Sequence, residues 1–354
     1  MVDQELKNKE EESQHRPISA APRLRFALIG TGGIAQTYAA AFQSSDCCEL
    51  KAVADIDKTS ADAFAEPFGA KSFDDYRSLA EKVEFDAVII STPPNTHPEI
   101  AIHLMGLGKH VLCEKPLCLS SADAVRMNEA AVENGVIFTM ASKFRYVADV
   151  IKAKSLVASG VLGEIVQFEN AFTSKVDMST RWNSDAEVAG GGVLIDNGTH
   201  SVDIIRYFLG PISEVLAVET GATQGLPVDE NVKLLAKTAD GVTASVDLTW
   251  GINKELPNFI SVYGTRGTLH VGWAESKYRS TSNPDWTVFG KGYDKVQAFR
   301  SKIENFRKAV FGKEELLIKP TDALASVEVI EAAYRSINQN HWQPVLEKSD
   351  VASS

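Results

Sequence analysis

Lys115 ends an apolar stretch in the segment KHVLCEKPLCL, between Glu114 and Pro116. A flexible ammonium at the end of a strand can hydrogen-bond a substrate oxygen and stabilise the negative charge that develops on it. An isolated lysine in such a position is usually only solvated, but the two motifs described next favour a chemical role. Pro116 also makes a cis Lys115–Pro116 bond accessible, since only X–Pro bonds adopt cis at low cost.

A carboxylate and an imidazole follow in the segment GGGVLIDNGTHSVD (190–203), where Asp196 and His200 are four residues apart. On a helix this spacing places both side chains on one face. A carboxylate beside an imidazole orients the ring and raises its basicity, so the pair predicts an acid/base group, and Asp203 could share the role of Asp196. A surface ion pair is the alternative. The glycines 190–192 favour close approach of a ligand. One Asp and one His make a poor metal site, and no metal is expected.

A glycine turn lies near the start, in RFALIGTGGIAQTYA (25–39), which predicts a strand, a tight turn and a helix. Gly30 permits the turn, Gly32 lets the backbone approach a pyrophosphate, and the helix N-terminus offers N–H donors to the anion. Asp55 ends the next expected strand, 25 residues after Gly30. Its carboxylate suits an unphosphorylated ribose and repels a 2′-phosphate. The sequence therefore predicts a dinucleotide site that takes NAD in preference to NADP.

The order of the elements predicts an α/β protein with two domains. Short apolar strands alternate with helices between residues 24 and 141, which is typical of a doubly wound parallel sheet that binds ligands at the carboxyl ends of its strands. After Phe144 the expected strands are longer and alternate in polarity, which indicates an antiparallel sheet, with helices over about 146–159, 193–208, 294–311 and 321–338. We expect a polar arm at 1–22, a nucleotide-binding domain at 23–143 and a second domain at 144–348.

Composition excludes several classes of protein. The formal net charge of −11, with no basic run, argues against a nucleic-acid partner. No apolar stretch approaches the roughly 18 residues of a transmembrane helix. The first twenty residues, MVDQELKNKEEESQHRPISA, are polar and charged and lack the apolar core of a secretory signal. A cytoplasmic location without membrane attachment is expected.

The ordered motifs GTGGIA, AVAD, STPPNTH, EKP, KFRY and GGGVLIDNGTHSVD resemble the glucose–fructose oxidoreductase / inositol dehydrogenase / MocA (Gfo/Idh/MocA) family over nearly the whole chain after the arm. The resemblance implies a Rossmann domain followed by an α+β domain with a large open, mainly antiparallel sheet. That sheet binds substrate on one side and often forms dimers or tetramers through its exposed face. We expect Trp250, Phe259 or Tyr263 on the exposed face, depending on register.

The same resemblance implies that Lys115 binds the reacting hydroxyl and that His200, supported by Asp196, accepts its proton. Arg145 matches a position that approaches substrate or nicotinamide, and Lys143 departs from the Asn or Gln expected two residues before it. Reasoning from position alone, we expect His97 to be a helix-start or turn residue and no acid/base. The residues implied to bind the cofactor are Gly30, Thr31, Gly32, Gly33, Ile34, Asp55, Ser91, Thr92, Pro93, Asn95, His97, Glu114, Lys115, Arg145 and Trp182.

The sequence thus predicts an NAD(P)-dependent dehydrogenase or reductase acting on CH–OH groups. The expected substrate is a secondary alcohol of a sugar, cyclitol or sugar derivative, and the expected assembly is a homodimer or homotetramer through the C-terminal sheet. Two alternatives remain. One is a non-catalytic nucleotide-binding sensor on the same fold, and the other is an enzyme resembling trans-dihydrodiol dehydrogenase.

Overall fold

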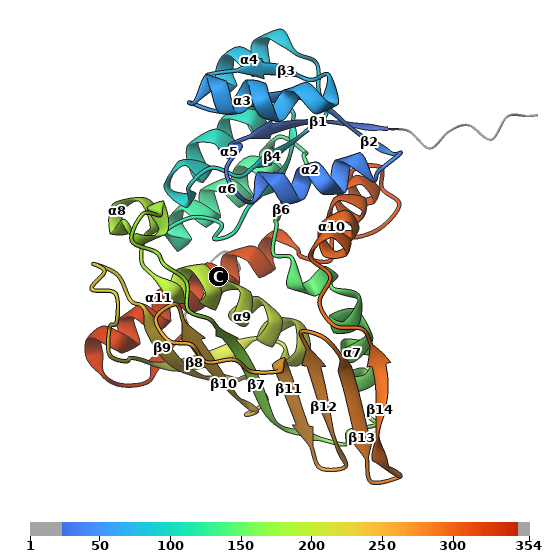
Figure 1. The fold of residues 1–354 in the computed structure, drawn as a ribbon, viewed down its shortest axis with the longest axis vertical. Helices are drawn as coiled ribbons and strands as arrows, with labels where there is room; N and C mark the ends of the chain where they lie inside the picture. Colours follow the sequence, from blue (N-terminus) through green and yellow to red (C-terminus); the bar gives the residue numbers. More distant parts are fainter. Residues whose placement is uncertain (1–22, 346–354) are drawn as a thin grey trace, which may run out of the picture.

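The computed structural model of the protein describes residues 23–345. The predicted arm at 1–22 and the last residues of the predicted second domain lie outside the described residues. Two sheets form the centres of the upper and lower halves of the molecule (Figure 1). The first has six parallel strands in the order β3-β2-β1-β4-β5-β6, and the second has nine strands in the order β14-β13-β12-β11-β7-β10-β9-β8-β15. The predicted fold class is confirmed.

The first sheet is buried on both faces, as its apolar strands require. All four residues of the central strand β4, AVII, are buried. Its strands are β1 (Leu24–Ile29), β2 (Cys48–Ala54), β3 (Lys71–Phe73), β4 (Ala87–Ile90), β5 (His110–Cys113) and β6 (Phe138–Met140). Its helices are α2 (Ala35–Gln43), α3 (Lys58–Ala65), α4 (Tyr76–Lys82), α5 (His97–Gly106) and α6 (Ser121–Glu133).

Helix capping in this domain is uneven. The side chains of Asp57, Asp75 and Ser120 accept hydrogen bonds from first-turn N–H groups of α3, α4 and α6. Ile34, at the start of α2, offers no such cap, and the first turn of α2 has no acidic residue. The positive end of the helix that follows the glycine turn is therefore free to receive an anion.

The second sheet is antiparallel except where β10 pairs with β7 in parallel. Its strands are β7 (Ile165–Thr173), β8 (Ile212–Glu219), β9 (Asn231–Thr238), β10 (Thr243–Thr249), β11 (Asn258–Gly264), β12 (Gly267–Gly272), β13 (Ser276–Ser280), β14 (Asn283–Gly290) and β15 (Gln343–Pro344). The accompanying helices are α7 (Ala148–Ala158), α8 (Ala186–Ala189), α9 (Val193–Leu209), α10 (Lys295–Val310) and α11 (Pro320–Gln339), and short 3₁₀ turns lie at 66–68, 94–96, 144–146 and 182–184.

Helices α7, α9 and α11 pack on one face of the second sheet, whereas α10 leaves this sheet and packs against α2 of the first domain (Figure 1). Phe299, Ile303 and Phe306 of α10 share a core with Phe26 of β1 and Tyr38 of α2. A helix late in the chain therefore completes the first domain. The boundary at 143/144 stays a prediction.

The register corrects one expectation about the second sheet. Trp250 and Phe259 are 3% and 1% exposed, so they face the covered side, and only Tyr263 is partly exposed. Leu235 and Val166 are among the exposed apolar residues of this sheet, with charged neighbours such as Lys233 and Lys237. No helix within residues 23–345 is both long and apolar enough to cross a membrane.

Candidate active site

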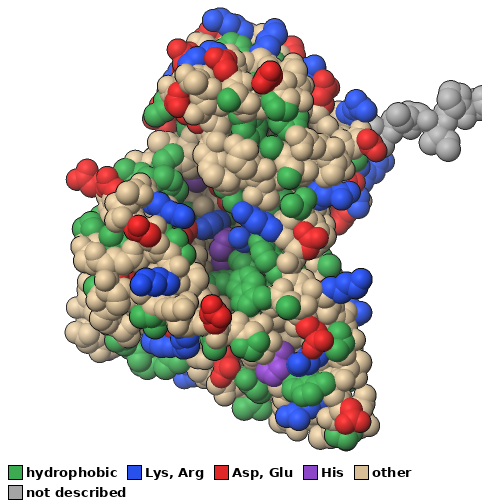
Figure 2. Space-filling view, in the orientation of Figure 1, with side chains coloured by type: hydrophobic (Ala, Val, Ile, Leu, Met, Phe, Trp, Pro, Cys, Tyr) green, Lys and Arg blue, Asp and Glu red, His purple; other side chains and the backbone are tan. Residues whose placement is uncertain are grey.

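A cavity of about 720 Å³ lies between the two halves of the molecule. Figure 2 shows the face of the molecule hollowed there, with lysine and arginine side chains gathered along the hollow above a hydrophobic floor. Predicted site residues that line the cavity are Gly32, Gly33, Ile34, Ser91, Thr92, Glu114, Lys115, Trp182 and Asp196. Lining residues that the prediction did not name as site residues are Ser174, Val176, Met178, Thr180, Arg181, Asn183, Asn197 and Trp250.

Lys115 and Asp196 form the charged centre of this cavity. Lys115 follows β5 and is joined to Pro116 by a cis peptide bond, while Asp196 lies in the first turn of α9. The Lys115 ammonium contacts the Asp196 carboxylate and lies 3.2 Å from the Asp196 carbonyl oxygen. Both side chains are about four-fifths buried, with exposures of 17% and 20%. The ammonium is thereby held in the wall of the cavity.

His200 lies one turn further along α9 and is 4% exposed. The structure differs from the expected pairing with Asp196, because the His200 Nδ1 atom lies 3.2 Å from Ser142 Oγ and the Asp196 carboxylate binds Lys115 instead. Burial, followed by the charges of Lys115 and Lys143, holds the pKa of His200 well below its ordinary value. The ring is therefore neutral at physiological pH, and within the described residues its Nε2 atom makes no hydrogen bond.

Arg145 does not line the cavity, and its predicted approach to the substrate or the nicotinamide stays a prediction. Its side chain is 5% exposed and pairs with Asp203, 2.7 Å away, and with Asp322, 3.2 Å away. Asp203 is fully buried; burial raises the pKa of its carboxyl, while Arg145 and the Ser142 hydroxyl lower it. Asp203 thus supports His200 indirectly, through Ser142. The sequence analysis suggested only that Asp203 could share the role of Asp196.

The glycine turn has the geometry that a pyrophosphate needs. Gly30 has φ +89°, and a Cβ there would lie 2.8 Å from backbone atoms of Ser91 and Thr92, so only glycine fits. A Cβ at Gly32 or Gly33 would meet nothing within 4 Å. These two glycines line the cavity at the uncapped end of α2, so the backbone is open to an anion. The residues present therefore fit a dinucleotide.

Asp55 is fixed beside the same turn. Its Oδ2 atom accepts hydrogen bonds from the Thr31 N–H and hydroxyl, both at 2.7 Å, and its Oδ1 atom accepts one from the Asp57 N–H. Trp182 is 42% exposed at the opposite wall, in the turn before α8. No group of three or more His, Cys, Asp or Glu side chains suited to a metal occurs between residues 23 and 345.

His97 is a structural residue, as its position suggested, and does not line the cavity. It is 1% exposed, and its ring nitrogens lie 2.8 Å from the Thr92 carbonyl oxygen and 3.0 Å from that of Leu117. It therefore ties the STPPNTH turn to the turn that follows Pro116. Its implied contact with the cofactor is not supported. Pro93 and Asn95 belong to the same turn, and neither lines the cavity in this structure.

Glu114 has a partner that the sequence analysis missed. The fully buried Lys302 of α10 donates to Glu114 Oε1 at 3.1 Å, and the Tyr38 hydroxyl donates to the same oxygen at 2.6 Å. Glu114 Oε2 in turn accepts the Lys115 backbone N–H. Lys302 stands on the apolar face of α10 with Phe299 and Phe306. A lysine on an apolar helical face is the signal in the sequence that could have revealed this buried pair.

Gly191 and Gly192 are required for packing, and the expected role of the glycines 190–192 as a ligand surface stays a prediction. A Cβ at Gly191 would meet the Tyr334 ring, and one at Gly192 would lie 2.0 Å from the Asp229 carbonyl oxygen. The Asp229 carboxylate accepts the N–H groups of Gly192 and Leu194 and the Tyr334 hydroxyl. Asp229 therefore caps α9, the helix that carries Asp196 and His200.

Two family models match the chain. Residues 24–142 match the Gfo/Idh/MocA oxidoreductase family with an NAD-binding Rossmann fold, and residues 150–270 match the C-terminal domain of the same family. Together these ranges span well over half of the 354 residues. The predicted resemblance to this family is thereby confirmed.

Curated relatives and solved structures agree with these matches. Glucose-6-phosphate 3-dehydrogenase of Bacillus subtilis is 33% identical over 52% of this chain, and the match spans only about half, 53%, of that relative. D-xylose 1-dehydrogenase (NADP(+)) 2 of Haloferax volcanii is 28% identical over 88% of this chain and 97% of its own length. Levoglucosan dehydrogenase, solved with NADH and levoglucosan, shares the fold with a TM-score of 0.85 at 23% identity, over 92% of this chain and 100% of that one. The chain therefore belongs to the Gfo/Idh/MocA family of oxidoreductases with an NAD-binding Rossmann domain.

Proposed function

We propose that the protein transfers a hydride between NAD and a secondary alcohol of a sugar, a cyclitol or a related compound. The observation that carries the proposal is the position of Lys115, held by Asp196 at a cavity that also contains an open glycine turn. His200 follows one turn after Asp196 on α9. A dinucleotide held at Gly32 and Gly33 supplies the hydride acceptor or donor.

His200 is the proposed acid/base. A neutral imidazole accepts a proton, and burial together with Lys115 keeps His200 neutral. We assign the Nδ1 proton to a hydrogen bond with Ser142, whose hydroxyl then points to Asp203. This chain fixes the tautomer and leaves Nε2 to take the hydroxyl proton during oxidation and return it during reduction.

Lys115 is the proposed oxygen-stabilising group. Its ammonium donates to the reacting oxygen and stabilises the alkoxide character that develops as the hydride leaves. Asp196 keeps the ammonium oriented, and Glu114 holds the backbone of Lys115 through the N–H bond to Oε2. Glu114 and Asp196 thus position Lys115, and Lys115 alone donates to the substrate oxygen.

Asp55 supports NAD as the preferred cofactor. Thr31 holds one of its oxygens, so the carboxylate stays beside the turn where an adenosine ribose binds. A 2′-phosphate there meets a fixed negative charge. The NADP specificity in the name of the Haloferax relative belongs to that protein.

The sugar class is supported by the named substrates of the relatives, which include glucose 6-phosphate, levoglucosan and D-xylose. The test is a panel of neutral sugars, sugar acids, sugar phosphates and cyclitols, assayed by the absorbance of the reduced cofactor. We expect turnover of at least one member with NAD, and loss of that turnover in Lys115→Met. Tight nucleotide binding without turnover of any member would instead favour the sensor.

Assembly and location complete the proposal. The open face of the second sheet carries Val166, Leu235 and Tyr263 among charged groups, and a homodimer or homotetramer through this face is the simplest way to cover them. Light scattering at micromolar concentration tests this, and a single-chain mass contradicts it. We place the protein in the cytoplasm, which cell fractionation checks.

A further inference from the structure

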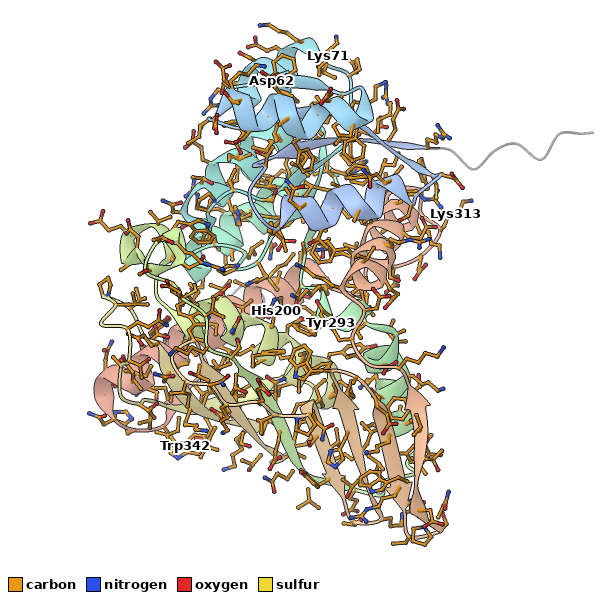
Figure 3. The ribbon with its side chains drawn as sticks, in the orientation of Figure 1. Asp62, Lys71, His200, Tyr293, Lys313 and Trp342 are labelled. Atoms are coloured by element: carbon orange, nitrogen blue, oxygen red, sulfur yellow. The ribbon has the colours of Figure 1, made fainter. Side chains whose placement is uncertain are left out.

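Five aromatic side chains form a wall beside His200, contributed by the turn before α7, by β7 and β11, by the segment after β12 and by the segment before α10. The Phe144 ring lies 4.9 Å from the His200 ring, and the Trp273 ring, 40% exposed, ends the wall toward solvent. Figure 3 shows His200 and Tyr293 close together below the first domain. The members of this aromatic wall are Phe144, Phe172, Phe259, Trp273 and Tyr293.

Lys143 lies over this wall without a counter-ion. Its Nζ atom is 5.1 Å from the centre of the Phe144 ring and 5.6 Å from that of Tyr293. The other lysines of the site are paired, Lys115 with Asp196 and Lys302 with Glu114. Lys143 forms no ion pair or hydrogen bond with any residue of the described chain.

The surroundings of Lys143 disfavour its charge. Burial first, and then the charges of Lys115 and Lys295, lower the pKa of Lys143 to about 7. Lys302 acts in the same direction, and Glu114 opposes it. Since Glu114 and Asp196 are already paired, a positive charge at Lys143 has no negative partner near it in the described structure. A bound anion would supply one.

The pyrophosphate of the dinucleotide is not that anion. The pyrophosphate belongs at Gly32 and Gly33, where the open backbone and the uncapped end of α2 lie. Lys143 is not among the residues that line the cavity shared by that turn and Lys115, and its Nζ atom lies over the Phe144 ring, whose centre is 4.9 Å from the His200 ring. The unpaired cation therefore lies beside the proposed acid/base and away from the glycine turn.

We propose that Lys143 binds an anionic group of the substrate, a carboxylate or a phosphate, while the C–H face of the sugar ring lies against the aromatic wall. This inference rests on the proposed function, because it places the reacting sugar beside His200. It selects sugar acids and sugar phosphates from the wider class of sugars and cyclitols.

The test measures binding to the enzyme–NADH complex by calorimetry, with D-glucuronate, D-glucose 6-phosphate and neutral D-glucose as probes. We expect at least one anionic probe to bind about tenfold to hundredfold more tightly than D-glucose. Lys143→Met, which keeps side-chain length, should remove this difference, and Lys143→Arg should keep most of it. Lys237→Met, which removes an exposed lysine of β9, is the matched control and should change nothing. The two anionic probes distinguish a carboxylate from a phosphate ligand.

The pH dependence adds a readout that a purely structural lysine would not change. Affinity for the anionic probe should fall as the pH rises and Lys143 loses its proton, and this fall should be absent in Lys143→Met. Equal binding of neutral and anionic probes, failure of both anionic probes to bind, or a Lys143→Met variant that loses D-glucose or NADH equally would overturn the inference.

The outcome is separable from that of the proposed function. Turnover of neutral sugars that depends on Lys115 and is unaffected in Lys143→Met leaves the oxidoreductase reaction standing and refutes the anion site. Anion binding that depends on Lys143, in a protein that turns over no member of the panel, supports the anion site and refutes the reaction.

Discussion

The buried pair of Lys302 and Glu114 allows a quantitative prediction for Lys302→Met. Methionine keeps the contacts of the side chain with Phe299 and Tyr38 but removes the ammonium, which lies 3.1 Å from Glu114 Oε1. The Lys302 side chain is fully buried and that of Glu114 is 7% exposed. The variant therefore leaves a carboxylate in the interior with only the Tyr38 hydroxyl and one backbone N–H to stabilise it.

Removing one partner of a buried ion pair typically costs about 3–5 kcal/mol of unfolding free energy. At the 2–4 °C per kcal/mol typical of domains of about 150–250 residues, that corresponds to a melting temperature lower by about 6–20 °C. The double variant Glu114→Gln/Lys302→Met contains neither charge and should recover most of the loss. Lys308→Met, on the exposed side of the same helix, removes a surface pair with Glu314 and should cost about 1 kcal/mol or less.

The unfolding free energy lost in Lys302→Met should depend on pH in one direction. In the native protein Lys302 holds the pKa of Glu114 below its ordinary value, so this stabilisation is present at neutral pH and is lost as the pH falls through the folded pKa. Without Lys302, burial raises that pKa instead. The stability gap between wild type and Lys302→Met should therefore narrow as the pH falls from about 7 to about 5.

Urea and thermal unfolding of five proteins, the wild type, these three variants and Glu114→Gln alone, at several pH values measure these quantities. The reasoning is refuted if Lys302→Met melts within about 2 °C of wild type. It is equally refuted if the double variant is as unstable as the sum of its single changes, or if the gap widens in acid.

Three further predictions concern the site. Asp55→Ser should narrow the preference for NAD over NADP, measured as the ratio of the two dissociation constants; tighter NADP binding by the wild type would contradict the role of Asp55. Because the pKa of His200 lies well below 6.5, the oxidation rate should stay level down to about pH 6.5 and fall only in stronger acid, and His200→Asn should lose both this acid limb and about a hundredfold in rate. Ser142→Ala should lower the rate about tenfold and shift the acid limb while leaving NADH affinity unchanged; an unshifted limb would remove Ser142 from the chain to Asp203.

Much of the architecture was predictable because hydrophobic periodicity is local. Five of the six parallel strands of the first domain and the long helix bearing His200 were expected close to where they occur, whereas the short strand β3 was missed. Strands β13 and β14 were missed, because at the exposed edge of the sheet their residues are largely polar. The packing of α10 against the first domain was also missed, because an apolar helical face does not reveal which core it joins.

The candidate site was likewise predictable only in part. Residue types and spacing singled out Lys115, Asp196 and His200 as candidate site residues. The local sequence pattern also predicted the strand that precedes Lys115 and the helix that carries Asp196 and His200. The partner of each depended on contacts between distant segments, and the sequence misassigned Asp196 to His200. Ser142 and Lys302 were not predicted, because a serine after a strand and a lysine on a helix have no motif of their own.

The central claim is that Lys115 and His200 act on the oxygen of a secondary alcohol at a dinucleotide site. The most direct test is single-turnover hydride transfer in wild type and Lys115→Met, with saturating NAD and a substrate taken from the panel. The account predicts a rate lower by about a hundredfold or more in the variant, with the dissociation constant for NADH changed by about twofold at most. A near-normal rate in Lys115→Met would show that the chemistry lies elsewhere.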